Sequence, residues 1–315
     1  MTRAFIFPGQ GSQAVGMGKL LADAFASARE VFEEVDDALG QKLSGLMWQG
    51  PEDQLVLTGN AQPAIMAASL AIVAILRGEG SFDLARHTRL VAGHSLGEYS
   101  ALCAAGAFTL PDTARLLKAR GRAMQSAVPV GEGGMSALLG AEIQQAEELV
   151  RECAAATGGV CVVANDNAPG QVVISGTKAA IDKAPEIAKA KGIKRAMALN
   201  VSAPFHCPLM QPAADKMREA LAAVTIRPLA VPVVSNVTAS QTSEPETIRR
   251  LLVEQVTGRV RWRESVLGFR ELGVETTVEA GGAKVLTGMV KRIDKDLQTV
   301  TLDTPADIEA FMKTL

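Results

Sequence analysis

Residues 91–101 read VAGHSLGEYSA and contain the pattern Gly93-His94-Ser95-Leu96-Gly97. An apolar run typical of a buried strand, residues 90–92, meets a helix-forming run that begins near Leu96, which leaves almost no residues for the turn. A G-x-S-x-G turn needs a small residue on each side of the serine, because other backbone segments pass close to it. The pattern predicts that Ser95 stands at the carboxyl edge of a sheet and at a helix N-terminus, where a developing anion is stabilised. An ordinary strand-to-helix turn with a capping serine would show the same short pattern.

Composition and charge exclude several classes of protein. The 315 residues carry a formal charge of -2, which gives no electrostatic signature of nucleic-acid binding. Aromatic residues make up only 4% of the chain while alanine, valine, leucine and glycine are plentiful, which favours helices packed closely on a parallel sheet. The four cysteines have no C-x-x-C spacing, so we expect neither a disulfide framework nor a metal site.

No segment has the pattern of a membrane span or a secretion signal. The longest apolar run, residues 64–76, is interrupted only by Ser69 and is too short to cross a bilayer. It follows Pro63, a favourable first helical residue, so we expect a buried core helix that starts there. The apolar tract at residues 4–7 ends at Pro8 and is too short for a signal peptide. We therefore expect a soluble, cytoplasmic protein without membrane contact.

The order of the predicted elements indicates an α/β chain with two units. Residues 131–203 follow the order βαββαβ, which is typical of a ferredoxin-like unit. Its predicted segments are strands 135–139, 160–164, 171–175 and 193–199, helices 141–156 and 178–191, a turn at 165–170 and a glycine-rich linker at 130–134. Strand and helix patterns continue on both sides, so this small unit is inserted into a hydrolase-like core with a parallel sheet. We expect that catalytic core to comprise residues 1–130 and 204–315.

Two further stretches of the core carry polar residues of interest. The loop after the first strand places Gly9, Gly11 and Ala14 in a G-x-G-x-x-A pattern, which fits either a dinucleotide site or a loop that presents backbone amides. In a helix predicted to open at Pro111, Arg120 falls on the face where apolar residues recur at spacings of three and seven. A guanidinium on such a face needs an anionic partner, either a structural one such as Glu98 or a ligand.

A nucleophilic serine needs a base, and the chain has three histidines. We expect His87 to be exposed in a polar stretch, and the side chain of His94 to diverge from that of its neighbour Ser95. His206 lies in a proline-flanked segment where the chain crosses back to the core, so its side chain can overhang a cleft. The group that orients this histidine stays open, since Asp112, Asp166 or a carbonyl oxygen could serve.

The ordered motifs of this sequence resemble those of the malonyl-CoA:acyl carrier protein transacylases. The matching segments are FPGQGSQ at 7–13, GHSLGEYSA at 93–101, RGRAMQ at 120–125, PGQVVISG at 169–176, APFH at 203–206 and VEQ at 253–255. Together they cover nearly the whole chain, and six motifs in the same order are far more specific than any single one.

This resemblance implies a role for each matching residue. Ser95 is the nucleophile that takes the malonyl group from coenzyme A, and His206 is its base. The backbone amides of Gln10 and Leu96 form the oxyanion hole, so the glycine-containing loop serves an oxyanion and not a dinucleotide. Arg120 binds the free carboxylate of the malonyl group. Gln255 offers the carbonyl that orients the histidine, so no third acid is expected.

The resemblance also implies the partners and the pathway. The substrates are malonyl-CoA and the phosphopantetheine thiol of an acyl carrier protein, and neither a cofactor nor a metal is required. Lys284, Lys291 and Arg292 are candidates for a basic rim that meets an acidic carrier protein, although they equally suit a solvated helix face. We expect Phe205 to narrow the pocket against α-branched acyl groups, and we expect a monomer that serves fatty acid synthesis.

Three alternatives remain open at the level of sequence. A serine thioesterase or esterase would share the turn and the oxyanion hole, but would leave Arg120 without a purpose. A catalytically silent module that binds coenzyme A or the carrier protein would not need both Ser95 and His206. A malonyl transferase that serves polyketide synthesis would use the same chemistry in another pathway.

Overall fold

A parallel sheet forms the centre of the larger part of the molecule. The computed structural model describes residues 2–201 and 203–315. Its six-stranded sheet has the order β10-β9-β1-β2-β7-β8. The strands are β1 (Arg3–Phe7), β2 (Leu90–Gly93), β7 (Val233–Val234), β8 (Gln241–Thr242), β9 (Thr276–Ala280) and β10 (Gln298–Leu302). All neighbours pair in parallel except β7 and β8. The carboxyl ends of β1 and β2 therefore lie side by side, which brings the loop after residue 7 next to the turn at Ser95.

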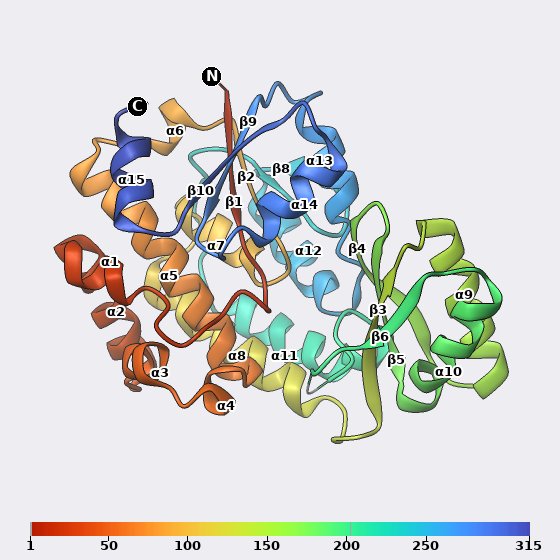
Figure 1. The fold of residues 1–315 in the computed structure, drawn as a ribbon. Helices are drawn as coiled ribbons and strands as arrows, with labels where there is room; N and C mark the ends of the chain where they lie inside the picture. The colour runs from red at the N-terminus through yellow and green to blue at the C-terminus, as the bar shows by residue number, and fades with distance from the viewer. Residues whose placement is uncertain (1, 202) are drawn as a thin grey trace.

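Alternating side chains of the central strands pack into two helical layers (Figure 1). In β1, Phe5 and Phe7 join the larger core cluster, whereas Ala4 and Ile6 face the smaller one. The larger cluster includes α1 (Lys19–Ala24), α2 (Ala26–Leu39), α3 (Leu43–Gln49), α4 (Glu52–Leu55), α5 (Thr58–Glu79), α6 (Leu84–His87), α7 (Gly97–Ala104), α8 (Leu110–Ser126), α11 (Gln211–Ala222), α12 (Pro245–Thr257) and α15 (Pro305–Met312). The smaller cluster includes α13 (Trp262–Phe269) and α14 (Val285–Ile293). This alternation is the period-two pattern of a strand that is buried on both faces.

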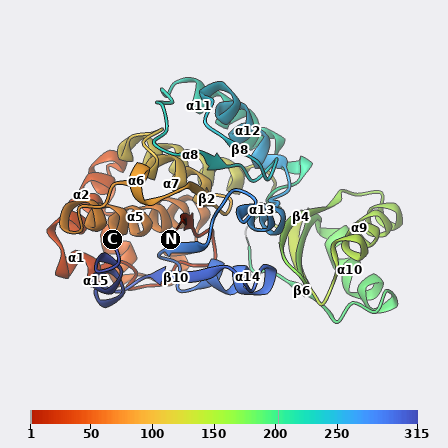
Figure 2. The ribbon, with the colours of Figure 1, turned by 90° about the horizontal axis from the view of Figure 1, so that it is seen from above.

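A second, antiparallel sheet lies to one side of the molecule, away from both termini (Figures 1 and 2). Its order is β4-β5-β3-β6, formed by β3 (Gly133–Leu139), β4 (Cys161–Ala168), β5 (Gln171–Thr177) and β6 (Arg195–Ala198). Two helices, α9 (Ile143–Thr157) and α10 (Lys178–Ala190), pack on it and share one hydrophobic cluster with its strands. The mixed α/β architecture with one mainly parallel and one antiparallel sheet agrees with the predicted class.

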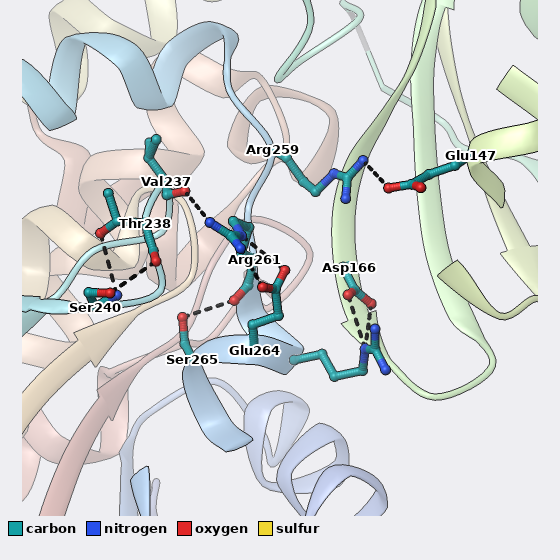
Figure 3. A network of polar contacts seen from close by, with 10 residues as sticks. Glu147, Asp166, Val237, Thr238, Ser240, Arg259, Arg261, Glu264 and Ser265 are labelled. Carbon is teal, nitrogen blue, oxygen red and sulfur yellow. Dashed lines mark hydrogen bonds and ion pairs between the residues drawn. The ribbon is translucent and has the colours of Figure 1, made fainter. Parts of the chain in front are cut away.

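Ion pairs join the antiparallel sheet and its helix α9 to α13 and the segment just before it (Figure 3). Arg259 contacts Glu147 of α9 at 2.9 Å, and Arg263 contacts Asp166 of β4 at 3.0 Å. The backbone reinforces this junction, because the N–H of Val260 donates to a carbonyl of β4. The free edge of β4 is thereby fixed beside the loop that follows α12.

Helix α5 runs through the larger core. It is long and apolar enough to cross a membrane by length and composition, and 89% of its most apolar window is buried inside the protein. Pro63 does not start this helix, which was a wrong prediction: the helix begins at Thr58 and the proline lies inside it. Pro63 is the sixth residue of α5 and has no N–H to donate to the carbonyl of Gly59, so the helix continues through it without that one hydrogen bond.

Several other predicted boundaries differ from the structure. Helical periodicity in the sequence extends from about Gly18 to Gly40, but the structure has two helices there, α1 and α2, separated at Phe25. The turn predicted at residues 165–170 is strand as far as Ala168, and β3 already begins at Gly133 within the predicted linker. Polar residues at 165–167 obscured the strand, and the side chains of Asp166 and Asn167 bind Arg263 and His94 in the larger part of the molecule.

Candidate active site

The turn between β2 and α7 places Ser95 at the carboxyl edge of the parallel sheet. Ser95 has a φ of 53°, in the left-handed region that few residues other than glycine adopt. A Cβ at position 93 would lie 1.9 Å from the carbonyl carbon of Gly97. A Cβ at position 97 would lie 2.2 Å from the carbonyl oxygen of Phe7. The two glycines are therefore required by close backbone packing, as the sequence pattern predicts.

His206 faces this serine. Its Nε2 lies 2.8 Å from Ser95 Oγ, and its Nδ1 lies 2.9 Å from the backbone oxygen of Gln255 and 3.1 Å from that of Gly258. Both carbonyls can only accept a hydrogen bond, so Nδ1 carries the proton and Nε2 is left to accept the serine hydroxyl proton. The side chain is only 4% exposed. Burial, reinforced by the nearby positive charge of Arg120, lowers the pKa of His206 to about 3 and keeps the base neutral.

Neither acidic candidate orients this histidine. Asp112 hydrogen-bonds to Thr109 at the start of α8, and Asp166 is paired with Arg263. The orienting group is a pair of backbone carbonyls, one of which belongs to Gln255. A backbone carbonyl leaves no mark in sequence, which is why residue types alone left this position open.

The two other histidines have separate partners. His94 Nε2 lies 2.8 Å from Asn167 Oδ1 on β4, so its side chain diverges from Ser95. His87 is half-buried and stacks on Phe82, and its Nδ1 accepts a hydrogen bond from the N–H of Asp83. The expectation that His87 is exposed was therefore wrong, because an aromatic ring covers one face of it.

Arg120 is buried beside the nucleophile. Its side chain is 1% exposed, its Nη1 donates to Gln62 Oε1 at 2.9 Å, and its Nη2 donates to Ser95 Oγ at 3.0 Å. Its Nε has no hydrogen-bond partner, and within residues 2–201 and 203–315 the guanidinium forms no ion pair with a carboxylate. The structural salt bridge to Glu98 considered from sequence is thus not formed. A buried, unpaired guanidinium is costly, so the site is suited to an anionic ligand.

The side chain of Gln255 connects the groups of the site. Its Oε1 accepts a hydrogen bond from Arg120 Nη2 at 2.9 Å. Its Nε2 lies 3.0 Å from the backbone oxygen of Ser95 and 2.7 Å from Glu98 Oε2. Burial raises the pKa of Glu98 to about 7. One residue therefore positions the base through its backbone and the guanidinium through its side chain.

Two backbone amides near Ser95 are available to an oxyanion. Among the described residues, neither the N–H of Gln10 nor that of Leu96 has a hydrogen-bond acceptor. The N–H of Ser95 is occupied, since it donates to Asn236 Oδ1 at 2.7 Å. The loop that carries Gln10 continues to Gly18 before α1 begins, so no helix N-terminus meets it as a dinucleotide fingerprint requires.

Sequence reasoning missed Asn236 and Gln62 and gave Glu98 a different partner. Asn236 and Glu98 hold the turn and Gln62 holds the guanidinium, and all three are at most 2% exposed. Asn236 comes shortly after β7, and the carboxyl end of a parallel strand is the place to look for such a residue. Gln62 lies directly before the apolar run at residues 64–76 of α5, and its polar side chain beside that run is the available signal.

A cavity of about 470 Å³ opens beside the base. Its walls include His206, the β4 residues Val162 and Val163, and the charged side chains of Arg151 and Arg259. It lies where the antiparallel sheet meets the loop after α12. The residues that line this cavity include His206 but neither Ser95 nor Arg120.

These features define a class of protein. A serine in a strained turn, activated by a neutral histidine and flanked by two available amides, is equipped to form an acyl-serine intermediate. The chain belongs to the acyl transferase domain family, whose profile matches residues 4–303, and it is an acyltransferase.

Relatives match over almost their full length. A malonyl CoA-acyl carrier protein transacylase of Bacillus subtilis is 43% identical over 99% of this chain and 96% of its own. The crystal structure of an acyl-carrier-protein-S-malonyltransferase from Bartonella henselae is 53% identical, with a TM-score of 0.97, covering 100% of this chain and 99% of the other. A malonyl-transacylase solved in complex with a type II PKS acyl-carrier protein is 41% identical, with a TM-score of 0.95, and both chains are covered completely.

Proposed function

We propose that this enzyme moves a malonyl group from malonyl-CoA to the phosphopantetheine thiol of an acyl carrier protein through an ester on Ser95. The full-length relatives carry this activity in their names. The observation that carries the proposal is the guanidinium of Arg120, which is 1% exposed, lacks a carboxylate partner among the described residues and lies 3.0 Å from the nucleophile. Unlike an acetyl group, a malonyl group carries a free carboxylate that can pair with this guanidinium.

In the first half-reaction the base activates the serine. His206 Nε2 accepts the hydroxyl proton while Ser95 Oγ attacks the thioester carbonyl, and the C=O bond becomes a C–O⁻ single bond. The amides of Gln10 and Leu96 donate to this oxyanion. The intermediate then collapses, the C–S bond breaks, and the protonated histidine gives its proton to the departing thiolate of coenzyme A.

The second half-reaction repeats these steps with another thiol. The carrier's phosphopantetheine thiol gives its proton to His206 and attacks the ester carbonyl, and the ester C–O bond breaks to restore Ser95. Thioester, ester and thioester are close in free energy, so the enzyme mainly stabilises two oxyanions and keeps water from the ester. The proposed chemistry needs no cofactor and no metal.

Arg120 selects the acyl group in this scheme. Its fork of N–H donors suits a carboxylate, and charge-assisted hydrogen bonds of this kind are about twice as strong as neutral ones. An acetyl group would leave the guanidinium unpaired, which penalises the wrong substrate. The hydrogen bond from Nη2 to Ser95 Oγ orients the guanidinium toward the place where the acyl group must sit.

Phe205 is the proposed limit on the size of the acyl group. It lies directly before the base, is 7% exposed and packs in the larger core. A rigid aromatic ring there leaves little room for a branch at the α-carbon. This role extends the selectivity for malonyl that Arg120 provides.

The cavity beside His206 is the proposed path of the pantetheine arm. Its mouth lies at the junction of the two sheets, so either coenzyme A or a carrier protein could deliver its thiol there. Lys284, Lys291 and Arg292 are all exposed and remain candidates for the basic rim that meets the carrier.

We also infer the finer description of the fold. The strand order β4-β5-β3-β6 with two helices supports a ferredoxin-like unit at residues 131–203, and the parallel sheet with its serine turn supports a hydrolase-like unit at residues 1–130 and 204–315. A cytoplasmic monomer that supplies fatty acid synthesis completes the proposal. A polyketide pathway would use the same site, and one of the structural relatives binds such a carrier.

A transfer assay separates this function from hydrolysis. Malonyl-CoA is incubated with the enzyme, with and without a phosphopantetheinylated acyl carrier protein, and malonyl-carrier and free malonate are both quantified. We expect malonyl-carrier as the main product and little malonate in either case. Malonate released at the same rate without a carrier would identify a thioesterase and overturn the proposal.

A further inference from the structure

The side chain of Asn236 closes the turn that carries the nucleophile. Its Oδ1 accepts a hydrogen bond from the N–H of Ser95 at 2.7 Å, and its Nδ2 donates to the carbonyl oxygen of Gly93 at 2.6 Å. Asn236 is 1% exposed and comes from the loop after β7, the strand next to β2. One amide group thus connects the peptide groups at both ends of the turn to a neighbouring strand.

This contact acts on a backbone that would otherwise relax. The φ of 53° at Ser95 is unfavourable for a side chain with a Cβ, and such conformations persist only where the surroundings enforce them. The flanking glycines permit the conformation but do not hold it. The side chain of Asn236 provides hydrogen bonds that hold the turn in this conformation.

Glu98 anchors the same arrangement from the first turn of α7. Its Oε2 accepts a hydrogen bond from the N–H of Asn236 at 3.1 Å and one from Gln255 Nε2 at 2.7 Å. The latter nitrogen also donates to the backbone oxygen of Ser95 at 3.0 Å. The peptide N–H and C=O of the nucleophile are therefore held by two amides that share one buried carboxyl oxygen.

We propose that Asn236 is a positioning residue with two effects on catalysis. It fixes the direction of Ser95 Oγ toward His206, and it occupies the N–H of Ser95. In some serine enzymes the nucleophile's own amide binds the oxyanion. Here the N–H of Ser95 already donates to Asn236, so the oxyanion binds the amide of Leu96 instead. The inference rests on the proposed function only in taking Ser95 as the nucleophile.

Amide hydrogen exchange in the unmodified enzyme tests the contact itself. The N–H of Ser95 lies before the first residue of α7 and has no helical acceptor, so within the described ranges 2–201 and 203–315 its only acceptor is the asparagine oxygen. We expect this amide to exchange at least tenfold more slowly than that of Leu96 when both are followed by NMR. Equal exchange rates would overturn the proposal.

Substitution tests the effect on the nucleophile. Asn236→Ala removes both contacts, and Asn236→Asp keeps the shape but places an oxygen where a donor faced the Gly93 carbonyl. The readout is the rate at which a fluorophosphonate labels Ser95, because this probe needs an activated serine but no malonyl group. A displacement of about 1 Å can cost about 100-fold in rate, so we expect a 10- to 100-fold slower labelling in both variants.

A matched control separates positioning from general destabilisation. Ser69 is 1% exposed and donates one hydrogen bond to the carbonyl of Ala280 at 2.7 Å, outside this network. Ser69→Ala should lower the melting temperature and leave labelling unchanged at a temperature where every variant is folded. Wild-type labelling in a folded Asn236 variant, or equal slowing in Ser69→Ala, would overturn the proposal. If the wild type is not labelled at all, the proposed function fails, and the exchange measurement still decides the contact.

Glu98→Gln extends the test to the anchor. The hydrogen bonds from Asn236 and Gln255 both reach the same oxygen, Oε2, so a glutamine amide oxygen can accept both. We expect near wild-type labelling in Glu98→Gln and slow labelling in Glu98→Ala. Slow labelling in both would mean that the negative charge acts on Ser95, which contradicts a role through hydrogen-bonded positioning.

Discussion

Arg120 donates a hydrogen bond to the hydroxyl oxygen of Ser95 across 3.0 Å, so the guanidinium and the proposed nucleophile are in direct contact. The same guanidinium is held from the other side by Gln62 and Gln255. A carboxylate bound by Arg120 therefore lies at a fixed distance from the attacking oxygen. This geometry links the choice of acyl group to its position for attack.

The first prediction concerns acyl selectivity. Arg120→Ala should lower kcat/KM for malonyl-CoA by about 100-fold, since two charge-assisted hydrogen bonds are lost, and should reduce the preference for malonyl-CoA over acetyl-CoA. Arg122→Ala is the matched control, because Arg122 is an exposed residue of the same helix. Unchanged selectivity in the Arg120 variant would show that the carboxylate binds elsewhere.

The second prediction concerns stability and pH. Burial lowers the pKa of His206 to about 3, so between pH 6.5 and 3 the unfolded chain binds a proton that the folded enzyme does not. The free energy of unfolding should therefore fall on acidification in this window, by at most about 1.4 kcal/mol per pH unit from this residue. Denaturant titrations of wild type and His206→Asn should converge as the pH falls. A constant difference between them would contradict the shift.

The third prediction concerns the glycines of the turn. Gly93→Ala should destabilise the enzyme and abolish acyl transfer, because its Cβ would lie 1.9 Å from the backbone of Gly97. Gly268→Ala in α13 meets no atom within 4 Å and should stabilise the fold slightly, by up to about 1 kcal/mol. Thermal melts of the two variants give the comparison. Equal melting temperatures would mean that the turn adapts to a side chain.

The fourth prediction concerns branched substrates. Phe205→Ser should raise the transfer of methylmalonyl relative to malonyl, roughly tenfold, because a pocket gains space for one methyl group. The comparison uses kcat/KM for the two coenzyme A thioesters with the same carrier protein. If the ratio does not change, the aromatic ring does not limit the acyl group.

The sequence predicted the turn because the need for glycine at positions 93 and 97 follows from sterics alone. A short strand, a serine between two glycines and a helix-forming run predict a tight turn, although an ordinary capped turn shares the pattern, and Gly93 and Gly97 are packed as the tight turn requires. Arg120 was predicted to be buried from its place on an apolar face. These features depend on local spacing, which a sequence displays directly.

Features that depend on distant contacts were not predictable in this way. The side chains of Asn236 and Gln255, which hydrogen-bond to the backbone of Ser95, lie 141 and 160 residues away from it in the sequence. The carbonyls that orient His206 carry no side-chain signature. The last strand and helix, β10 and α15, were missed as well, since strand β10 is only partly buried and shows little apolar alternation.

The most direct test is the intact mass of the enzyme after incubation with malonyl-CoA in the absence of any carrier. We expect one added malonyl group on the wild type and none on Ser95→Ala. An adduct that persists in Ser95→Ala, or free malonate without any adduct on the wild type, would contradict a malonyl ester on Ser95.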